Sequence, residues 1–70
     1  MQLIVNEERF EVEDNQNINQ FIEWYKEQGY LTQENFALAI NMEFIPRSVY
    51  TETTLKDGDK VEIVFPMQGG

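Results

Sequence analysis

Hydrophobic and polar positions alternate along residues 1–12, with a short polar interruption in the middle. Because successive side chains of a strand point to opposite faces of a sheet, a period of two predicts β-strands. The positions that share the apolar face are Met1, Leu3, Val5, Phe10 and Val12. Residues 1–12 therefore predict a hairpin that turns at Asn6 and Glu7.

The period changes to that of a helix in the segment NINQFIEWYKEQG. Its apolar residues, spaced at i, i+3, i+4 and i+7, are Ile18, Phe21, Ile22 and Tyr25. Asn17 is a favourable N-cap, Gln20 completes a capping box, and Gly29 supplies a left-handed stop. We therefore predict a helix over residues 18–28, with Trp24 on its flank as a half-buried cover of the core.

The remainder of the chain returns to a period of two. The segment FALAI has large apolar side chains on one face and two small ones, Ala37 and Ala39, on the other. The segment NMEFIPR predicts a turn and a short strand that ends at Pro46, because proline cannot donate a ladder hydrogen bond. After a tight turn in LKDGDK, the segment KVEIVFP predicts the last strand, with Glu62 and Val64 facing away from the core.

The predicted order is β-β-α-β-(β)-β, which indicates an α+β domain with one helix packed on one face of a mixed sheet of four or five strands. At this length, the order is that of the β-grasp fold, in which the first and last strands lie parallel in the middle of the sheet. We expect residues 1–66 to form this single domain and residues 67–70 to form an extended, flexible C-terminal tail.

The sheet face that the helix leaves uncovered is predicted to carry apolar side chains. Ile4 and Val64 take outward positions on strands expected to be adjacent, so we expect them to be neighbours, with Ala39 beside them. An exposed apolar cluster is typical of a docking site. However, β-branched residues favour strands at any position, and single exposed apolar residues are common. Both interpretations stay open at this point.

The charge of the chain narrows the classes of partner. Thirteen acidic and five basic residues give the 70-residue chain a net charge of −8. Such a chain is repelled by nucleic acids and by anionic membrane surfaces, and it suits a partner with a basic groove. No apolar run approaches the roughly 20 residues of a membrane span, and the first residues lack the features of a signal peptide. We expect a cytoplasmic protein that binds neither nucleic acid nor membranes.

The chain contains neither cysteine nor histidine. It therefore lacks a thiol nucleophile, thiolate metal ligands and the side chain that titrates nearest neutral pH. These absences make an enzyme less probable than a binding or carrier protein. We expect no catalytic residue and no metal site in the chain.

The last four residues, Met67, Gln68, Gly69 and Gly70, follow directly on the predicted final strand. The segment PMQGG can extend up to about 17 Å, far enough to reach another protein's active site. Without Cβ atoms, Gly69 and Gly70 can pass through a channel too narrow for other residues. ATP can convert an α-carboxylate delivered in this way to an acyl-adenylate, from which a sulfur or amine nucleophile displaces AMP. We therefore interpret the chain as a substrate of enzymes.

About half the chain, ALAINMEFIPRSVYTETTLKDGDKVEIVFPMQGG, resembles the ThiS-type sulfur carriers of thiamine (thiazole) biosynthesis, which are ubiquitin-like β-grasp proteins. The shared pattern is an apolar strand, an Asn turn, a hydrophobic-Pro-Arg segment ending at Arg47, L-x-D-G-D, hydrophobic-E-I-V and a final Gly-Gly. The family favours Asn-Gly turns, whereas this chain has Asn6-Glu7 and Asn41-Met42. Arg47 is a possible partner contact, with a purely solvated arginine as the alternative.

The resemblance implies that an E1-like adenylyltransferase uses ATP to adenylate Gly70. Sulfur derived from cysteine through a desulfurase then converts the adenylate to a thiocarboxylate, from which a thiazole synthase takes the sulfur. No cofactor is expected to bind the chain itself, and we expect a monomer when no partner is present. Three alternatives remain: the small subunit of a molybdopterin-synthase-like system, a ubiquitin-like protein modifier and a plain interaction module.

Overall fold

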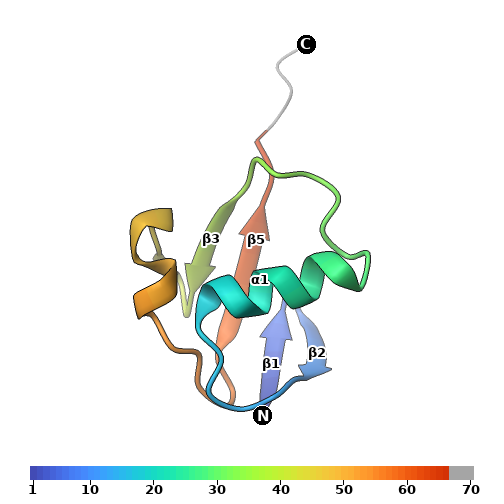
Figure 1. Ribbon diagram of the computed structural model, residues 1–70, viewed down its shortest axis with the longest axis vertical. Helices are drawn as coiled ribbons and strands as arrows, with labels where there is room; N and C mark the ends of the chain where they lie inside the picture. Colours follow the sequence, from blue (N-terminus) through green and yellow to red (C-terminus); the bar gives the residue numbers. More distant parts are fainter. Residues whose placement is uncertain (67–70) are drawn as a thin grey trace.

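Five strands form one mixed sheet in the order β2-β1-β5-β3-β4 in the computed structural model (Figure 1). The strands are β1 (Gln2–Val5), β2 (Glu8–Glu11), β3 (Ala37–Ile40), β4 (Glu43–Phe44) and β5 (Lys60–Val64). One α-helix, α1 (Ile18–Glu27), packs on one face of this sheet. The structure describes residues 1–66, and the predicted tail lies outside the described residues. The architecture is the β-grasp fold, which confirms the predicted fold class.

The first and last strands lie side by side in the middle of the sheet. They run parallel, with Val5 opposite Val61. On its other side β5 pairs antiparallel with β3, so that Leu38 lies opposite Ile63 and Ala37 opposite Val64. The predicted parallel pairing of the first and last strands is confirmed.

Each of the two hairpins turns through two residues with positive φ. The values are 47° and 71° at Asn6 and Glu7, and 50° and 71° at Asn41 and Met42. Two consecutive residues of this kind form a type I′ turn, whose twist matches that of the flanking strands. Asparagine tolerates this conformation, whereas Glu7 and Met42 adopt it at a steric cost because they carry a Cβ atom. The hairpin predicted at Asn6 and Glu7 is confirmed without an Asn-Gly sequence.

The helix begins and ends with the predicted signals. The side chain of Asn17 accepts a hydrogen bond from the Gln20 amide at 2.8 Å, and the Gln20 side chain accepts one from the Asn17 amide at 2.9 Å. At the other end Gly29 has a φ of 87°, and the Tyr30 amide donates to the Tyr25 carbonyl at 3.2 Å. This is the closure expected of a Schellman motif, and it stacks the two tyrosine rings with centroids 5.2 Å apart.

The core lies between the sheet and α1. Its buried residues are Leu3, Val5, Val12, Ile18, Phe21, Tyr25, Leu31, Leu38, Tyr50, Leu55, Val61 and Ile63. Trp24 is half-buried at the margin of this core, with its ring edge-on to Phe10 at a centroid distance of 6.1 Å. This position confirms its predicted place as a cover. Burial raises the pKa of both Tyr25 and Tyr50 above that of a free phenol, so both stay neutral near pH 7.

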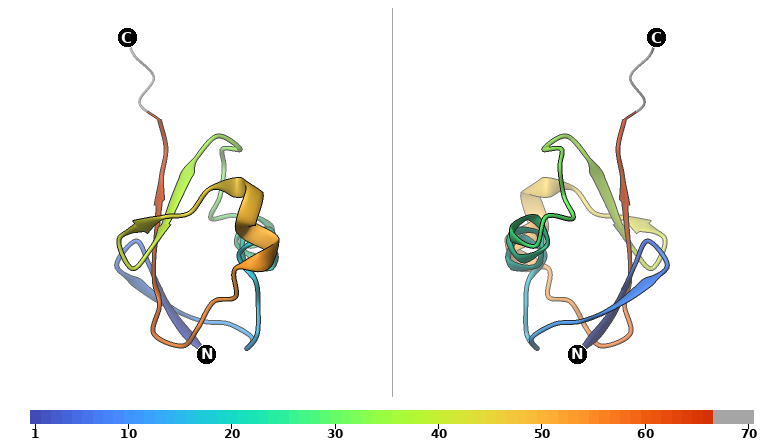
Figure 2. Two further views of the ribbon diagram at one scale, coloured as in Figure 1. Left: turned by 90° about the vertical axis from the view of Figure 1, so that its left-hand side faces the viewer. Right: turned by 90° about the vertical axis from the view of Figure 1, so that its right-hand side faces the viewer.

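A 3₁₀ helix, η1 (Arg47–Glu52), follows β4 after Ile45 and Pro46 and was absent from the sequence-based expectation. It begins after Pro46 and buries the side chain of Tyr50 in the core. Figure 2 shows η1 and α1 on the same side of the sheet, so the other sheet face is open. Among the helices of residues 1–66, none is long and apolar enough to cross a membrane.

Candidate functional site

Strand β5 leads the chain out of the sheet at the end away from Met1 (Figures 1 and 2). Its last residue is Val64, and Phe65 and Pro66 are the last residues that the structure describes. Phe65 is partly buried against the core. The predicted modification site at Gly70 and the tail residues before it lie outside the described residues, so the structure describes only the point from which they continue.

The predicted proximity of Ile4 and Val64 on the open face is wrong. Ile4 lies opposite Lys60, whereas Val64 lies opposite Ala37 on the other neighbouring strand. Strand β1 ends at Val5, before β5 reaches Val64. Lys60 and Val64 are four residues apart on β5, which corresponds to about 13 Å at a rise of about 3.3 Å per residue. Adjacent strands therefore do not bring these two side chains together.

Val64 instead has an apolar neighbourhood on β3 and β4 that includes a residue missed by the sequence analysis. Phe44 is 64% exposed and lies opposite Ala39, and Val64 is 57% exposed and lies opposite Ala37. We call these four residues the open-face patch. The signal for Phe44 was the turn at Asn41 and Met42, because a two-residue turn fixes the register that sets Phe44 opposite Ala39.

Ile4 belongs to a second region of the open face with a different character. It is half-buried and lies opposite Arg9 on β2 and Lys60 on β5, so a cationic side chain flanks it on each side. These residues line a shallow depression together with Asn6 and Glu62. Ile4 is therefore set in a charged row rather than in the open-face patch.

Arg47 is also separate from the open-face patch. Its guanidinium donates to the carbonyl oxygen of Glu34 at 2.6 Å and lies 4.5 Å from the centroid of the Phe36 ring. A longer contact of 3.5 Å joins it to the carbonyl of Phe36. These contacts hold the loop that precedes β3. The structure therefore gives this exposed arginine contacts within the chain, so it is not the purely solvated side chain considered from the sequence. Its contact with a partner stays a prediction.

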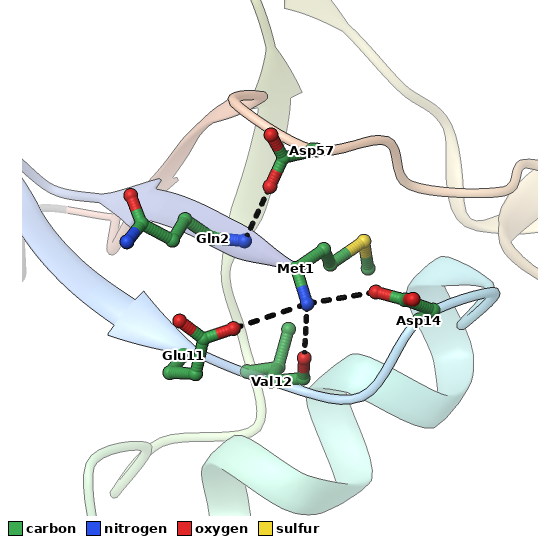
Figure 3. A network of polar contacts seen from close by, with 6 residues as sticks. All are labelled: Met1, Gln2, Glu11, Val12, Asp14 and Asp57. Atoms are coloured by element: carbon green, nitrogen blue, oxygen red, sulfur yellow. Dashed lines mark hydrogen bonds and ion pairs between the residues drawn. The ribbon is translucent and has the colours of Figure 1, made fainter.

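A cluster of charged contacts surrounds the amino group of Met1 (Figure 3), at the end of the sheet away from the exit of β5 (Figure 1). The ammonium group of Met1 donates to the Val12 carbonyl at 2.7 Å and contacts carboxylate oxygens of Asp14 at 2.7 Å and Glu11 at 3.2 Å. The hydrogen bond to Asp14 is the main cause that raises the pKa of this amino group above 8.0. The network ties the start of β1 to the segment after β2 and is remote from the exit of β5.

Residues 1–66 contain no group of three or more side chains placed to hold a metal ion. The described part of the chain instead offers an exposed apolar surface, the open-face patch, beside the strand that leads to the chain's C-terminal segment.

Comparisons with known proteins agree with this geometry. The ThiS family profile matches residues 1–70. The structure is similar to a crystal structure of a thiamine biosynthesis protein (ThiS) from Geobacter metallireducens, with a TM-score of 0.78 and 30% identity over 100% of both chains. An NMR structure of a thiamine biosynthesis protein from the same organism gives a TM-score of 0.74 and 32% identity, covering 100% of this chain and 88% of that one.

A more distant similarity is to the complex of subunits 1 and 2 of molybdopterin-converting factor from Helicobacter pylori 26695. The TM-score is 0.69 and the identity 27%, over 100% of both chains. A search of curated proteins found no match. The family profile covers every residue of the chain, from the first strand through the final Gly69 and Gly70. The chain belongs to the ThiS family.

Proposed function

We propose that this chain is a sulfur carrier for thiamine biosynthesis and that the carried sulfur is bound at Gly70. An activating enzyme transfers AMP from ATP to the carboxylate of Gly70 and releases pyrophosphate. A nucleophile at the oxidation level of sulfide, with its sulfur derived from cysteine, then attacks the acyl-adenylate and displaces AMP, which leaves a thiocarboxylate. A thiazole synthase takes up the sulfur and returns the carboxylate. The chain itself is a protein substrate in each of these steps.

The observation that carries this proposal is the family match over residues 1–70, which includes the final Gly-Gly sequence. The similarity to thiamine biosynthesis proteins of known structure supports the same role. The fold is compatible with it, because the strand before the C-terminal segment is paired on both sides and therefore anchored in the sheet. The lack of cysteine and histidine fits a chain that leaves the chemistry to its partners.

We further propose that the activating enzyme docks on the open-face patch. Val64 and Phe44 are both more than half exposed, and exposed apolar side chains that gather in one place are typical of protein interfaces. The patch lies beside the last residues of β5, so an enzyme that receives the C-terminal segment passes close to it. The net charge of −8 favours an enzyme with a basic surface around the docking site.

Intact-mass measurement tests the modification. Protein isolated from a host that makes thiamine should contain a fraction that is heavier by the difference between a sulfur and an oxygen atom. Treatment with a thiol-alkylating reagent should label the thiocarboxylate sulfur of this fraction. The label is specific for it, because the chain has no cysteine thiol that could react instead. The same heavier species in a variant that lacks Gly70 would refute the assignment to this residue.

The matched control for this experiment is a variant with one residue added after Gly70. It keeps all 70 residues and displaces only the carboxylate, so it should fold normally and yield no heavier species. If this variant and the parent chain unfold at the same urea concentration, the heavier species is absent because the carboxylate is displaced and not because the domain is unfolded.

A second function, the small subunit of a molybdopterin-synthase-like system, is favoured by the similarity to the Helicobacter pylori complex. It uses the same C-terminal chemistry and differs in the acceptor of the sulfur. Complementation separates the two functions: we expect the chain to restore growth of a thiazole auxotroph and not molybdenum-cofactor synthesis. A third reading, a protein modifier, requires covalent conjugates on a denaturing gel, and we expect none.

A further inference from the structure

Asn6 stands at the end of β1, where its side chain reaches across to β5. Its amide donates to the carbonyl of Val61 at 2.9 Å. Its Oδ1 accepts a hydrogen bond from the Ile63 amide at 2.9 Å, and its Nδ2 donates to the Ile63 carbonyl at 3.3 Å. One residue therefore makes three hydrogen bonds to the main chain of β5.

These side-chain bonds extend the parallel ladder beyond its last residue pair. The backbone of β1 is opposite β5 only as far as Val5 and Val61, and the chain then turns away at Asn6. A carboxamide carries one carbonyl acceptor and an N–H donor, the same groups as a peptide unit. The Asn6 side chain thus offers the Ile63 main chain an acceptor and a donor, the two groups that the backbone of a longer β1 would supply.

We call the two side-chain hydrogen bonds between Asn6 and Ile63 the tether. The tether lies immediately before the point at which the chain leaves the sheet. Two residues after Ile63 the chain has passed the last β5 residue, Val64, and reached Phe65. In the described part of the chain, Ile63 is the last residue of β5 whose main chain is hydrogen-bonded from the β1 side. On the β3 side the pairing ends one residue later, at Val64 and Ala37.

Asn41 provides an internal comparison because it has the same place in the other hairpin. Its φ is 50°, and its Oδ1 accepts from the Lys60 amide at 3.0 Å, while its Nδ2 contacts Asp59 Oδ1 at 3.1 Å. Its own amide donates to the Lys60 carbonyl at 2.8 Å. Two turn asparagines therefore hold β5 at its two ends, and only Asn6 holds the end from which the C-terminal segment continues.

We propose that Asn6 is a positioning residue for the activation of Gly70: by pairing with Ile63 it keeps the end of β5 in the sheet and fixes the direction in which the chain leaves it. This inference rests on the proposed function. Without the tether, the end of β5 frays, and the activating enzyme must order additional backbone when it binds. The enzyme therefore binds the carrier more weakly, and the KM rises. The rate of the chemical step stays nearly unchanged, because the bound segment has the same final geometry.

Glycine substitutions at the two asparagines test this proposal as a matched pair. Asn6→Gly and Asn41→Gly each remove one side-chain amide, and glycine retains the positive φ that both turns need. The rates to measure are those of ATP–pyrophosphate exchange by the E1-like enzyme of the same host, at varied concentrations of the full-length carrier. Unfolding in urea shows how much stability each variant has lost.

We expect Asn6→Gly to raise the KM for the carrier on the order of tenfold, the factor that corresponds to ordering about one further residue on binding. We expect its kcat to change less than about twofold, since the chemical step is unaffected. Asn41→Gly should leave both constants near those of the parent chain even where its stability falls equally. Asn6→Asp, which keeps the acceptor for the Ile63 amide, should have an intermediate KM.

Hydrogen exchange supplies a readout that does not depend on the enzyme. In Asn6→Gly the exchange rate of the Ile63 amide should rise by more than the loss of global stability explains. In Asn41→Gly any rise at Ile63 should match the loss of global stability. An equal rise in KM in the two glycine variants, or a parental KM in Asn6→Gly despite faster exchange at Ile63, would overturn the inference. A parent chain that supports no exchange of pyrophosphate would overturn the proposed function, and this inference with it.

Discussion

Ile63 and Val64 are adjacent on β5 and face opposite sides of the sheet. Ile63 is 5% exposed and packs in the core beneath α1, whereas Val64 is 57% exposed on the open face. Both are β-branched, and the pattern of the strand alone does not distinguish an exposed valine with a binding role from one that only favours the strand conformation. The covered face contributes stability through burial, and the open face is free to contribute binding. The difference between them arises from what covers each face.

The largest expected effect separates the two faces by stability. Ile63→Ala should lower the free energy of unfolding by about 2–5 kcal/mol, because it deletes buried methyl and methylene groups and leaves a cavity. Val64→Ala should lower it by less than about 1 kcal/mol, since the side chain is already more than half exposed. Urea unfolding followed by the fluorescence of Trp24 measures both. Equal losses would show that the open face is part of the folding core.

Activation by the partner enzyme should depend on the open face rather than on the covered face. Phe44→Ser should raise the KM for the carrier about 5- to 30-fold, which corresponds to about 1–2 kcal/mol, the cost expected of an interface residue that contributes to binding. The control is Met42→Ser, since Met42 is 88% exposed but lies in the turn and outside the open-face patch. We expect this variant to keep the parental KM. A similar loss in both variants would show that exposed apolar area in general, and not the patch, determines binding.

A smaller effect should follow from relieving the strained turn beside the open face. Met42 adopts a φ of 71°, which a glycine reaches without the Cβ clash. After allowance for the greater freedom of glycine in the unfolded chain, Met42→Gly should raise the free energy of unfolding by about 0.5–1 kcal/mol. Its KM for activation should stay unchanged. Urea unfolding measures the change in stability. A lower free energy of unfolding in Met42→Gly would show that Met42 is not strained in the parent chain.

The smallest effect concerns the charged network at the start of β1. The folded-state pKa of the Met1 amino group is raised above 8.0, with the hydrogen bond to Asp14 as the main cause. A raised pKa means that the stabilisation is fully present below pH 8.0 and is lost as the pH rises through the folded-state value. Asp14 is 75% exposed, so solvent screening keeps the contribution small.

The test is the urea midpoint as a function of pH in the parent chain and in Asp14→Asn. The two should differ most at neutral pH and converge in alkaline solution, where the amino group is neutral in both. Subtracting one curve from the other removes the titration of other groups, such as tyrosine and lysine. A difference that stays constant with pH would show that Asp14 acts without the Met1 charge.

Local signals in the sequence were sufficient for most of the elements. The capping box at Asn17 and the stop at Gly29 marked the helix to within one residue of its end, because both depend on hydrogen bonds within a few residues. The alternation in the last strand separated Val61 and Ile63 from Glu62 and Val64 correctly. By contrast, η1 was missed, because its residues carry no helical stripe and its place depends on burying Tyr50 beneath a distant segment.

The sequence likewise predicted one part of the candidate site and not the other. Which side chains of β1 and β5 face outward followed from a period of two within each strand, a property of the sequence alone. Which outward side chains meet depended on register and strand length: Ile4 lies beside Lys60, and Phe44 joins the surface around Val64. The tether from Asn6 to Ile63 also joins residues far apart in the chain. Periodicity is set within one strand, whereas register is set only when strands pair, so the composition of the site was decided by the tertiary structure.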